Sequence, residues 1–146
     1  MRTIVKGTLI ACLSLLAATS LAADDDDDKK AKKALKPIAE YDQMKRYEPT
    51  GKVVRDIRLN AVDRTNVLDD NTILFIMRGK LAYVNRMKHA CAGLKREDRF
   101  SYETVNGRLT SLDTISVLDS FGRRWASCGL DTFVEYKRIP KPKKDS

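Results

Sequence analysis

The sequence predicts a mainly β protein: a small antiparallel barrel or sandwich of about six or seven short strands, with a short helix near its amino end. Three observations lead to this fold class. Runs of alternating or branched apolar residues recur through the second half of the chain. Turn signals separate these runs about every 8 to 12 residues. The segments between them are too short for the helices that connect parallel strands.

The first 22 residues have the organisation of a secretory signal peptide. Two basic residues precede an apolar stretch from Gly7 to Ala18, and small residues follow. The stretch is shorter than the about 20 apolar residues that span a bilayer. We therefore expect cleavage after Ala22 or Ala23 and a periplasmic or secreted location. Two alternatives are an uncleaved anchor and a lipoprotein, because Leu9–Cys12 resembles a lipobox whose Cys12 would carry the lipid.

A charged low-complexity linker is expected over residues 23–37. It holds five consecutive aspartates, Asp24–Asp28, followed by a cluster of lysines. Such blocks cannot bury apolar surface and stay solvated. A short helix and turn are expected over residues 38–50, because Ile38 and Tyr41 share one helical face after the starting Pro37.

The β domain is expected over residues 51–136. Gly79-Lys80 joins two apolar runs as a β-hairpin, and Asn106-Gly107 is the strongest short hairpin signal in the chain. The strand candidates are 53–59, 66–68, 72–78, 81–87, 99–105, 112–118 and 130–136. The aromatic residues on these runs are expected in the core, because a domain this small needs them inside: Phe75, Tyr83, Phe100, Tyr102, Phe133 and Tyr136.

Two cysteines, Cys91 and Cys128, remain after signal cleavage. An even number of cysteines in an exported chain favours a disulfide, and two buried free thiols are the alternative. The chain has no C-x-x-C motif. A thioredoxin-like redox centre and a zinc ribbon therefore lack their ligand spacing.

The net charge of +8 and a pI of about 9.5 are unevenly distributed. Residues 29–50 and 137–146 each carry four more basic than acidic residues, whereas residues 51–136 carry only three more. Affinity for anionic surfaces is therefore expected in these two tails. The basic tail, 137–146, should matter more, because Asp24–Asp28 offers the N-terminal lysines an internal partner and the prolines of 137–146 keep it extended. The alternative is a solubilising tail that binds nothing. The expected partners are lipid headgroups, lipopolysaccharide and cell-wall polymers. The residues expected to bind them are Lys137, Arg138, Lys141, Lys143 and Lys144.

Most enzyme chemistry lacks its residues in this chain. The single histidine, His89, cannot build a His-based zinc site, and Cys91 beside it cannot attack a substrate if it forms a disulfide. No G-x-S-x-G, Gly-rich phosphate loop or H-E-x-x-H is present, so we expect no metal and no cofactor. The acids at turns could supply paired carboxylates, although turn capping is the simpler interpretation: Asp69, Asp70, Glu97, Asp98 and Asp113.

A high pI is also typical of proteins that bind nucleic acid. Such binding would need aromatic side chains displayed on a basic face. The strand aromatics are required in the core, and an exported protein rarely meets nucleic acid. We therefore expect no nucleic-acid partner.

Several short motifs occur in a fixed order: Val67–Phe75, Met77–Gly79, Cys91–Leu94, Glu97–Tyr102, Asp113–Asp119 and Ser127–Leu130. This order resembles a family of small exported bacterial proteins that carries only a domain-of-unknown-function label (DUF six-four-nine-one). The resemblance covers about Val53 to Phe133. It implies a Gram-negative envelope location and a disulfide-bearing β domain, and it implies no catalytic residues.

The same resemblance bears on the cysteine pairing. Family members often have two further cysteines at the positions where Arg55 and Thr110 stand here. Their joint absence implies that those two pair with each other in the family. It leaves Cys91 to pair with Cys128.

These patterns predict a non-enzymatic, exported envelope domain with a binding or accessory role that is not an integral membrane protein. The alternative is an enzyme or enzyme inhibitor that acts on envelope polymers through the acidic turns. The alternative requires a pocket lined by two or more of the five turn acids, whereas a filled interior favours the binding module.

The processing prediction can be tested by intact mass. Protein recovered from the periplasm should lack residues 1–22 or 1–23 and carry no lipid, because the apolar run is typical of a cleaved signal peptide. A mass that includes acyl chains on Cys12 would establish a lipoprotein instead.

Overall fold

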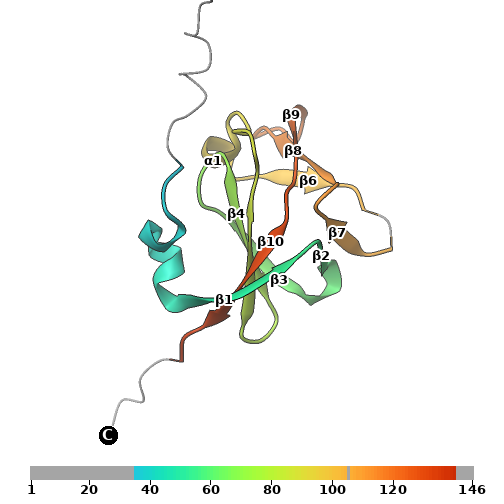
Figure 1. The fold of residues 1–146 in the computed structure, drawn as a ribbon. Coiled ribbons are helices and arrows are strands. Elements are labelled where there is room, and N and C mark those ends of the chain that lie inside the picture. Colours follow the sequence, from blue (N-terminus) through green and yellow to red (C-terminus); the bar gives the residue numbers. More distant parts are fainter. Residues whose placement is uncertain (1–34, 105, 141–146) are drawn as a thin grey trace, which may run out of the picture. The chain divides into compact units, whose positions relative to one another are not determined.

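The structure is a computed structural model that describes residues 35–104 and 106–140 (Figure 1). The expected signal peptide, its cleavage site at Ala22 or Ala23, the lipobox Cys12 and most of the charged linker lie outside the described residues. The last part of the basic tail also lies outside them, including Lys141, Lys143 and Lys144.

Five antiparallel strands form the main sheet, in the spatial order β1-β10-β5-β4-β3. The order places the last strand, β10, between the first strand and the β4–β5 hairpin. The strand bounds are β1 (Tyr47–Val54), β3 (Val62–Val67), β4 (Thr72–Met77), β5 (Leu81–Arg86) and β10 (Phe133–Arg138).

Two smaller antiparallel sheets complete the β structure. One pairs β2 (Asp56–Arg58) with β7 (Arg108–Thr110). The other has the order β6-β8-β9. Its strands are β6 (Phe100–Tyr102), β8 (Thr114–Leu118) and β9 (Arg124–Gly129).

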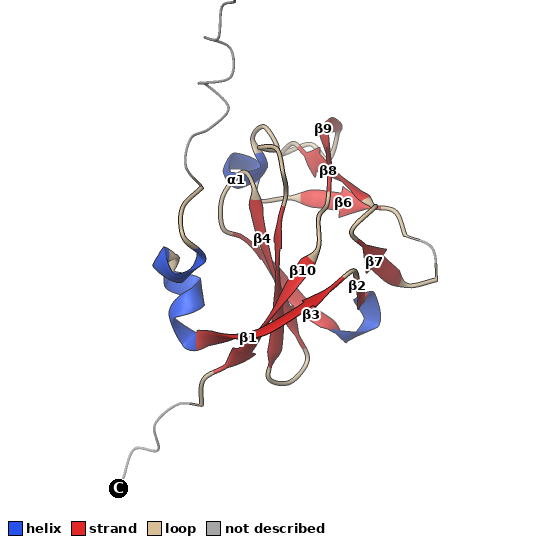
Figure 2. Cartoon of the chain, in the orientation of Figure 1, coloured by secondary structure: helices blue, strands red, loops and turns tan. Residues whose placement is uncertain are grey.

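Helix is confined to short pieces, as the colouring by secondary structure shows (Figure 2). The segment expected as a helix forms two 3₁₀ turns, η1 (Ile38–Glu40) and η2 (Asp42–Arg46), because the backbone of Tyr41 between them is extended. The other two pieces are η3 (Leu59–Ala61) and α1 (Leu94–Glu97).

The mainly β fold class is confirmed, and of the two expected forms, barrel or sandwich, the sheets do not form a closed barrel. The described residues form ten strands in three antiparallel sheets, more than the six or seven expected. The main sheet does not close, because β1 and β3 at its two edges each pair with only one neighbour in the described part of the chain. The sequence did not single out β7, β9 or most of β1, and the run 53–59 divides between the end of β1 and β2.

One of the two expected hairpins has different pairing partners. The β4–β5 hairpin forms around Gly79, as predicted. Asn106 and Gly107 have the expected left-handed backbone, with φ of 60° and 65°. However, β6 pairs with β8 and β7 pairs with β2. The distant pairing places Leu109 opposite Ile57, and both side chains are buried there. Core burial therefore outweighs the local turn preference.

The core covers both faces of the main sheet, and all six residues of β4 are buried. On one face Phe75 and Phe133 pack edge to face, with ring centroids 5.7 Å apart, against residues of the two smaller sheets. On the other face Leu74 and Val84 pack against Tyr41 of the 3₁₀ region. Of the aromatic residues expected in the core, Tyr102 instead remains exposed.

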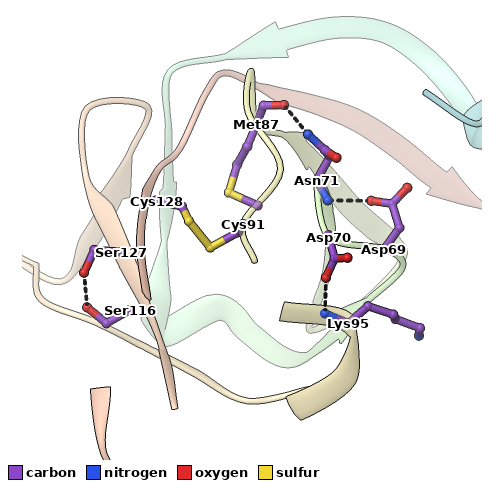
Figure 3. Close-up of a disulfide and its surroundings, with 9 residues drawn as sticks. All are labelled: Asp69, Asp70, Asn71, Met87, Cys91, Lys95, Ser116, Ser127 and Cys128. Carbon is purple, nitrogen blue, oxygen red and sulfur yellow. Dashed lines mark hydrogen bonds between the residues drawn. A yellow bond between two sulfur atoms is a disulfide. The ribbon is translucent and has the colours of Figure 1, made fainter. Parts of the chain in front are cut away.

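Cys91 and Cys128 form a disulfide, as predicted, with their Cα atoms 5.7 Å apart (Figure 3). The bond joins the loop after β5 to β9, which is an edge strand of the three-stranded sheet. Cys91 is fully buried, and its N–H donates to the Asp70 carbonyl at 2.7 Å. The disulfide therefore anchors an edge strand to the core.

Removing this disulfide should destabilise the domain strongly. The two cysteines are 37 residues apart. Closing such a loop is worth about 4 kcal/mol in the chain-entropy model. This is a large share of the roughly 5–15 kcal/mol that holds a domain folded. Cys128→Ser should lower the melting temperature by more than about ten degrees or abolish folding.

Ser127→Ala is the matched control, since Ser127 is the exposed neighbour of Cys128 on β9. It should melt close to the native protein. Thermal melts measure both variants, and two free thiols in the native protein would contradict the prediction.

Candidate functional site

The acidic residues expected at turns are engaged in structural contacts. Asp69 accepts hydrogen bonds from the Tyr41 hydroxyl and from the Asn71 N–H, the latter at 2.7 Å. Although burial raises the pKa of Asp69, these hydrogen bonds hold it below its ordinary value. Asp70 accepts the N–H of Lys95 at 2.8 Å and so connects the β3–β4 turn to α1 (Figure 3). Both carboxylates therefore stabilise loops.

The remaining turn acids are Glu97, Asp98 and Asp113. Asp113 accepts the Thr110 N–H at 2.6 Å, and Glu97 pairs with Arg96 at 2.9 Å. Asp98 ends α1 with a left-handed backbone, φ 51°. No two of the five turn acids line either of the hollows found among the described residues. Neither hollow is therefore the acid-lined pocket that the enzyme alternative requires.

The larger hollow, of about 520 Å³, lies beside the disulfide. Its walls include His89 and Leu112, and Asp131 is its only acid. Asp131 already accepts the Thr132 N–H at 2.6 Å, and Cys91 is in the disulfide, so His89 has no nucleophilic thiol to activate. Across the described ranges no group of three His, Cys, Asp or Glu residues could hold a metal ion.

Glu135 on β10 is a buried acid that sequence reasoning missed, because it stands on a strand in simple alternation. Its side chain accepts the Tyr83 hydroxyl at 2.9 Å and the Thr50 hydroxyl at 3.1 Å. The Lys52 ammonium lies 3.7 Å from the same carboxylate. This cluster ties β1, β10 and β5 together. These contacts give Glu135 a structural role.

Two residues beyond Glu135, basic side chains gather where β10 ends. The Arg138 N–H donates to the Lys80 carbonyl at 2.7 Å, and the Ile139 N–H donates to the Arg46 carbonyl at 2.9 Å. These backbone bonds bring together η2, the β4–β5 turn and the end of β10 (Figure 1). We name this surface the basic end; its exposed cations are Arg46, Arg78, Lys80, Lys137 and Arg138.

The cations of the basic end are not neutralised by ion pairs. Within residues 35–104 and 106–140, none of the five lies within 4 Å of a carboxylate oxygen. Two exposed acids are near: Glu48 pairs in register with Lys137, and the charge of Asp63 acts on Arg138. The five cations therefore leave a net positive surface.

Arg138 is held in place by the tyrosine opposite it. Its guanidinium donates to the Tyr47 hydroxyl at 3.1 Å and lies 5.7 Å from the centre of that ring. The hydrogen bond to Tyr47 raises the pKa of Arg138 above its ordinary value. The charge is therefore permanent and fixed in direction.

The structure places two predicted binding residues, Lys137 and Arg138, on the basic end. Arg46, Arg78 and Lys80 join them, although the sequence did not single them out. A basic Arg78-Gly79-Lys80 turn was visible in the sequence. Its proximity to the tail follows only from the pairing of β10 with β5.

No family model, curated protein or solved structure matches this chain. Among the described residues no helix is both long enough and apolar enough to cross a membrane.

The Tyr83–Glu135 contact yields a prediction on pH. Burial, together with the hydrogen bond to Glu135, raises the pKa of Tyr83 to about 12. The folded state thus keeps a proton that the unfolded chain releases near pH 10, so this contribution to stability is complete below pH 10 and is lost as the pH rises through about 12. Tyr83→Phe should cost about 1 to 2 kcal/mol at pH 8 and should flatten the alkaline loss.

Urea denaturation at pH 8, 10 and 11 measures both effects. Tyr102→Phe is the control, because Tyr102 is exposed on β6. A Tyr83→Phe variant whose stability falls with pH as steeply as that of the native protein would refute the assignment.

Proposed function

We propose that this protein is an exported, non-enzymatic accessory domain that binds an anionic surface of the bacterial envelope through the basic end. The observation that carries the proposal is the convergence of five exposed cations from three segments of the chain, without an ion pair among the described residues. Backbone hydrogen bonds set their positions, so the charge cluster is built into the fold.

The proposed location rests on three supports. The disulfide fits an oxidising compartment. The amino-terminal pattern is typical of a cleaved signal peptide. The order of motifs resembles that of small exported Gram-negative envelope proteins. Together they favour the periplasm over secretion into the medium.

The strength of binding is set by charge. A basic residue near an anionic membrane contributes about 1 kcal/mol, and salt screens this contribution within a Debye length. Five cations opposed by Glu48 and Asp63 therefore supply a few kcal/mol, before Lys141, Lys143 and Lys144 add to them. This corresponds to weak, reversible and strongly salt-dependent binding.

The enzyme alternative receives less support. Asp69, Asp70 and Asp113 accept backbone N–H groups and Glu97 pairs with Arg96. The hollow beside the disulfide has Asp131 as its only carboxylate. Paired carboxylates would have to lie within about 10 Å of each other on one substrate. The binding role requires no such pair.

Reversing charge on the basic end should abolish binding. The double variant Lys80→Glu/Lys137→Glu lowers the net charge by four, and so does the control Lys88→Glu/Arg58→Glu, whose residues are exposed elsewhere. Sedimentation with phosphatidylglycerol vesicles at about 50 mM salt should show loss of binding for the first variant only, and about 300 mM salt should weaken the native protein.

A chain that ends at Pro140 should retain part of the binding, because it keeps the five cations of the basic end. Equal binding by both double variants would show that net charge, rather than this surface, is responsible.

A further inference from the structure

The basic end also exposes two large apolar side chains. Leu81, the first residue of β5, is 37% exposed, and Ile139, directly after β10, is 44% exposed. Single exposed apolar residues are common on protein surfaces, whereas several together among polar groups are typical of an interaction surface.

The strand register places these two side chains together. Lys137 is paired with Leu81, and the Arg138 N–H bonds to the Lys80 carbonyl, so Ile139 continues along the same line opposite Gly79. Ile139 and Leu81 are then diagonal neighbours on the same sheet face as Lys137, about 7–8 Å apart. Gly79 has no side chain that could cover Ile139, and apart from its chain neighbours no other atom lies within 4 Å of the position that its Cβ would take.

Other exposed apolar residues lack this setting. Phe121 lies beside Arg123, whose charge is taken by Asp119 at 2.8 Å. Trp125 lies beside Arg96, which is paired with Glu97. Phe121 lies in the β8–β9 turn and Trp125 on β9. This hairpin is at the end of the domain away from the basic end (Figure 1). The basic end instead has two uncovered apolar side chains on a surface whose five cations have no ion pair among the described residues.

We infer that the anionic surface bound by the basic end is a lipid bilayer, and that Leu81 and Ile139 enter its interfacial region while the surrounding cations contact the headgroups. This inference rests on the proposed function. Apolar side chains flanked by lysine and arginine are the combination by which proteins bind the interface of anionic membranes. A cell-wall polymer or other soluble polyanion would satisfy the cations but leave both apolar side chains in water.

The inferred contact sets the orientation of the domain. The carboxyl end of β10 and the β4–β5 turn face the membrane, and the disulfide and β9 lie at the far end (Figure 1). Lys137 and Arg138 reach the headgroups on either side of the inserted pair.

Insertion can be tested by fluorescence, since Trp125 is the single tryptophan and lies at the far end. In the full mature chain, Ile139→Trp should shift its emission to the blue on phosphatidylglycerol vesicles and be quenched by brominated acyl chains. The native protein, bound to the same vesicles, should show neither change. Inorganic polyphosphate, a polyanion without hydrocarbon, should bind both proteins without a shift.

A second pair of variants tests the insertion without introducing a tryptophan. Leu81→Ser should weaken vesicle binding by about tenfold and leave polyphosphate binding unchanged, because only the apolar contribution is lost. Leu112→Ser, at a position 92% exposed and remote from the basic end, should change neither.

The outcomes separate the two proposals. Vesicle binding without quenching, or with no effect of Leu81→Ser, overturns the insertion and leaves the anionic-surface function standing. Binding to polyphosphate but not to vesicles also overturns the insertion. Binding to neither overturns the proposed function itself.

Discussion

The pairing of β10 on both of its sides is the constraint on which the rest of the structure depends. This strand joins β1 from the beginning of the domain to the β4–β5 hairpin from its middle. Glu135 reinforces the pairing from within, since it accepts hydroxyls from Thr50 on one neighbour and Tyr83 on the other. A buried carboxylate without such donors would oppose folding. The sheet, its core and the basic end all form around this strand.

The disulfide provides the equivalent constraint for the smaller sheets. The strand β9 is an edge strand with one neighbour, and most of its residues are exposed. Few of its side chains are therefore packed in the core. The bond from Cys128 to the fully buried Cys91 supplies stability that this packing does not. Small domains gain much of their stability from such covalent ties, because their cores are limited.

The carboxylates of Asp69, Asp70, Asp113 and Glu135 are engaged in hydrogen bonds within the domain, whereas the cations of the basic end have no carboxylate partner among the described residues. The acids at the turns cap backbone N–H groups, and the carboxylate of Glu135 is surrounded by donors. Catalytic groups must instead face a substrate. The cations at the end of β10 face solvent together with Leu81 and Ile139, and this difference favours surface binding over chemistry.

The sequence by itself determined the local features: the mainly β class, the turn at Gly79, the left-handed turn at Asn106 and the disulfide between the two remaining cysteines. Each of these features depends on neighbouring residues or, for the disulfide, on the number of cysteines. Only the tertiary structure decided which strands pair, that Glu135 is buried and that Lys80 lies beside Arg138. Alternation identifies a strand, but its partner is selected by the burial of distant side chains such as Ile57 and Leu109. The charge of each residue follows from its own side chain. The basic end exists because β10 pairs with β5.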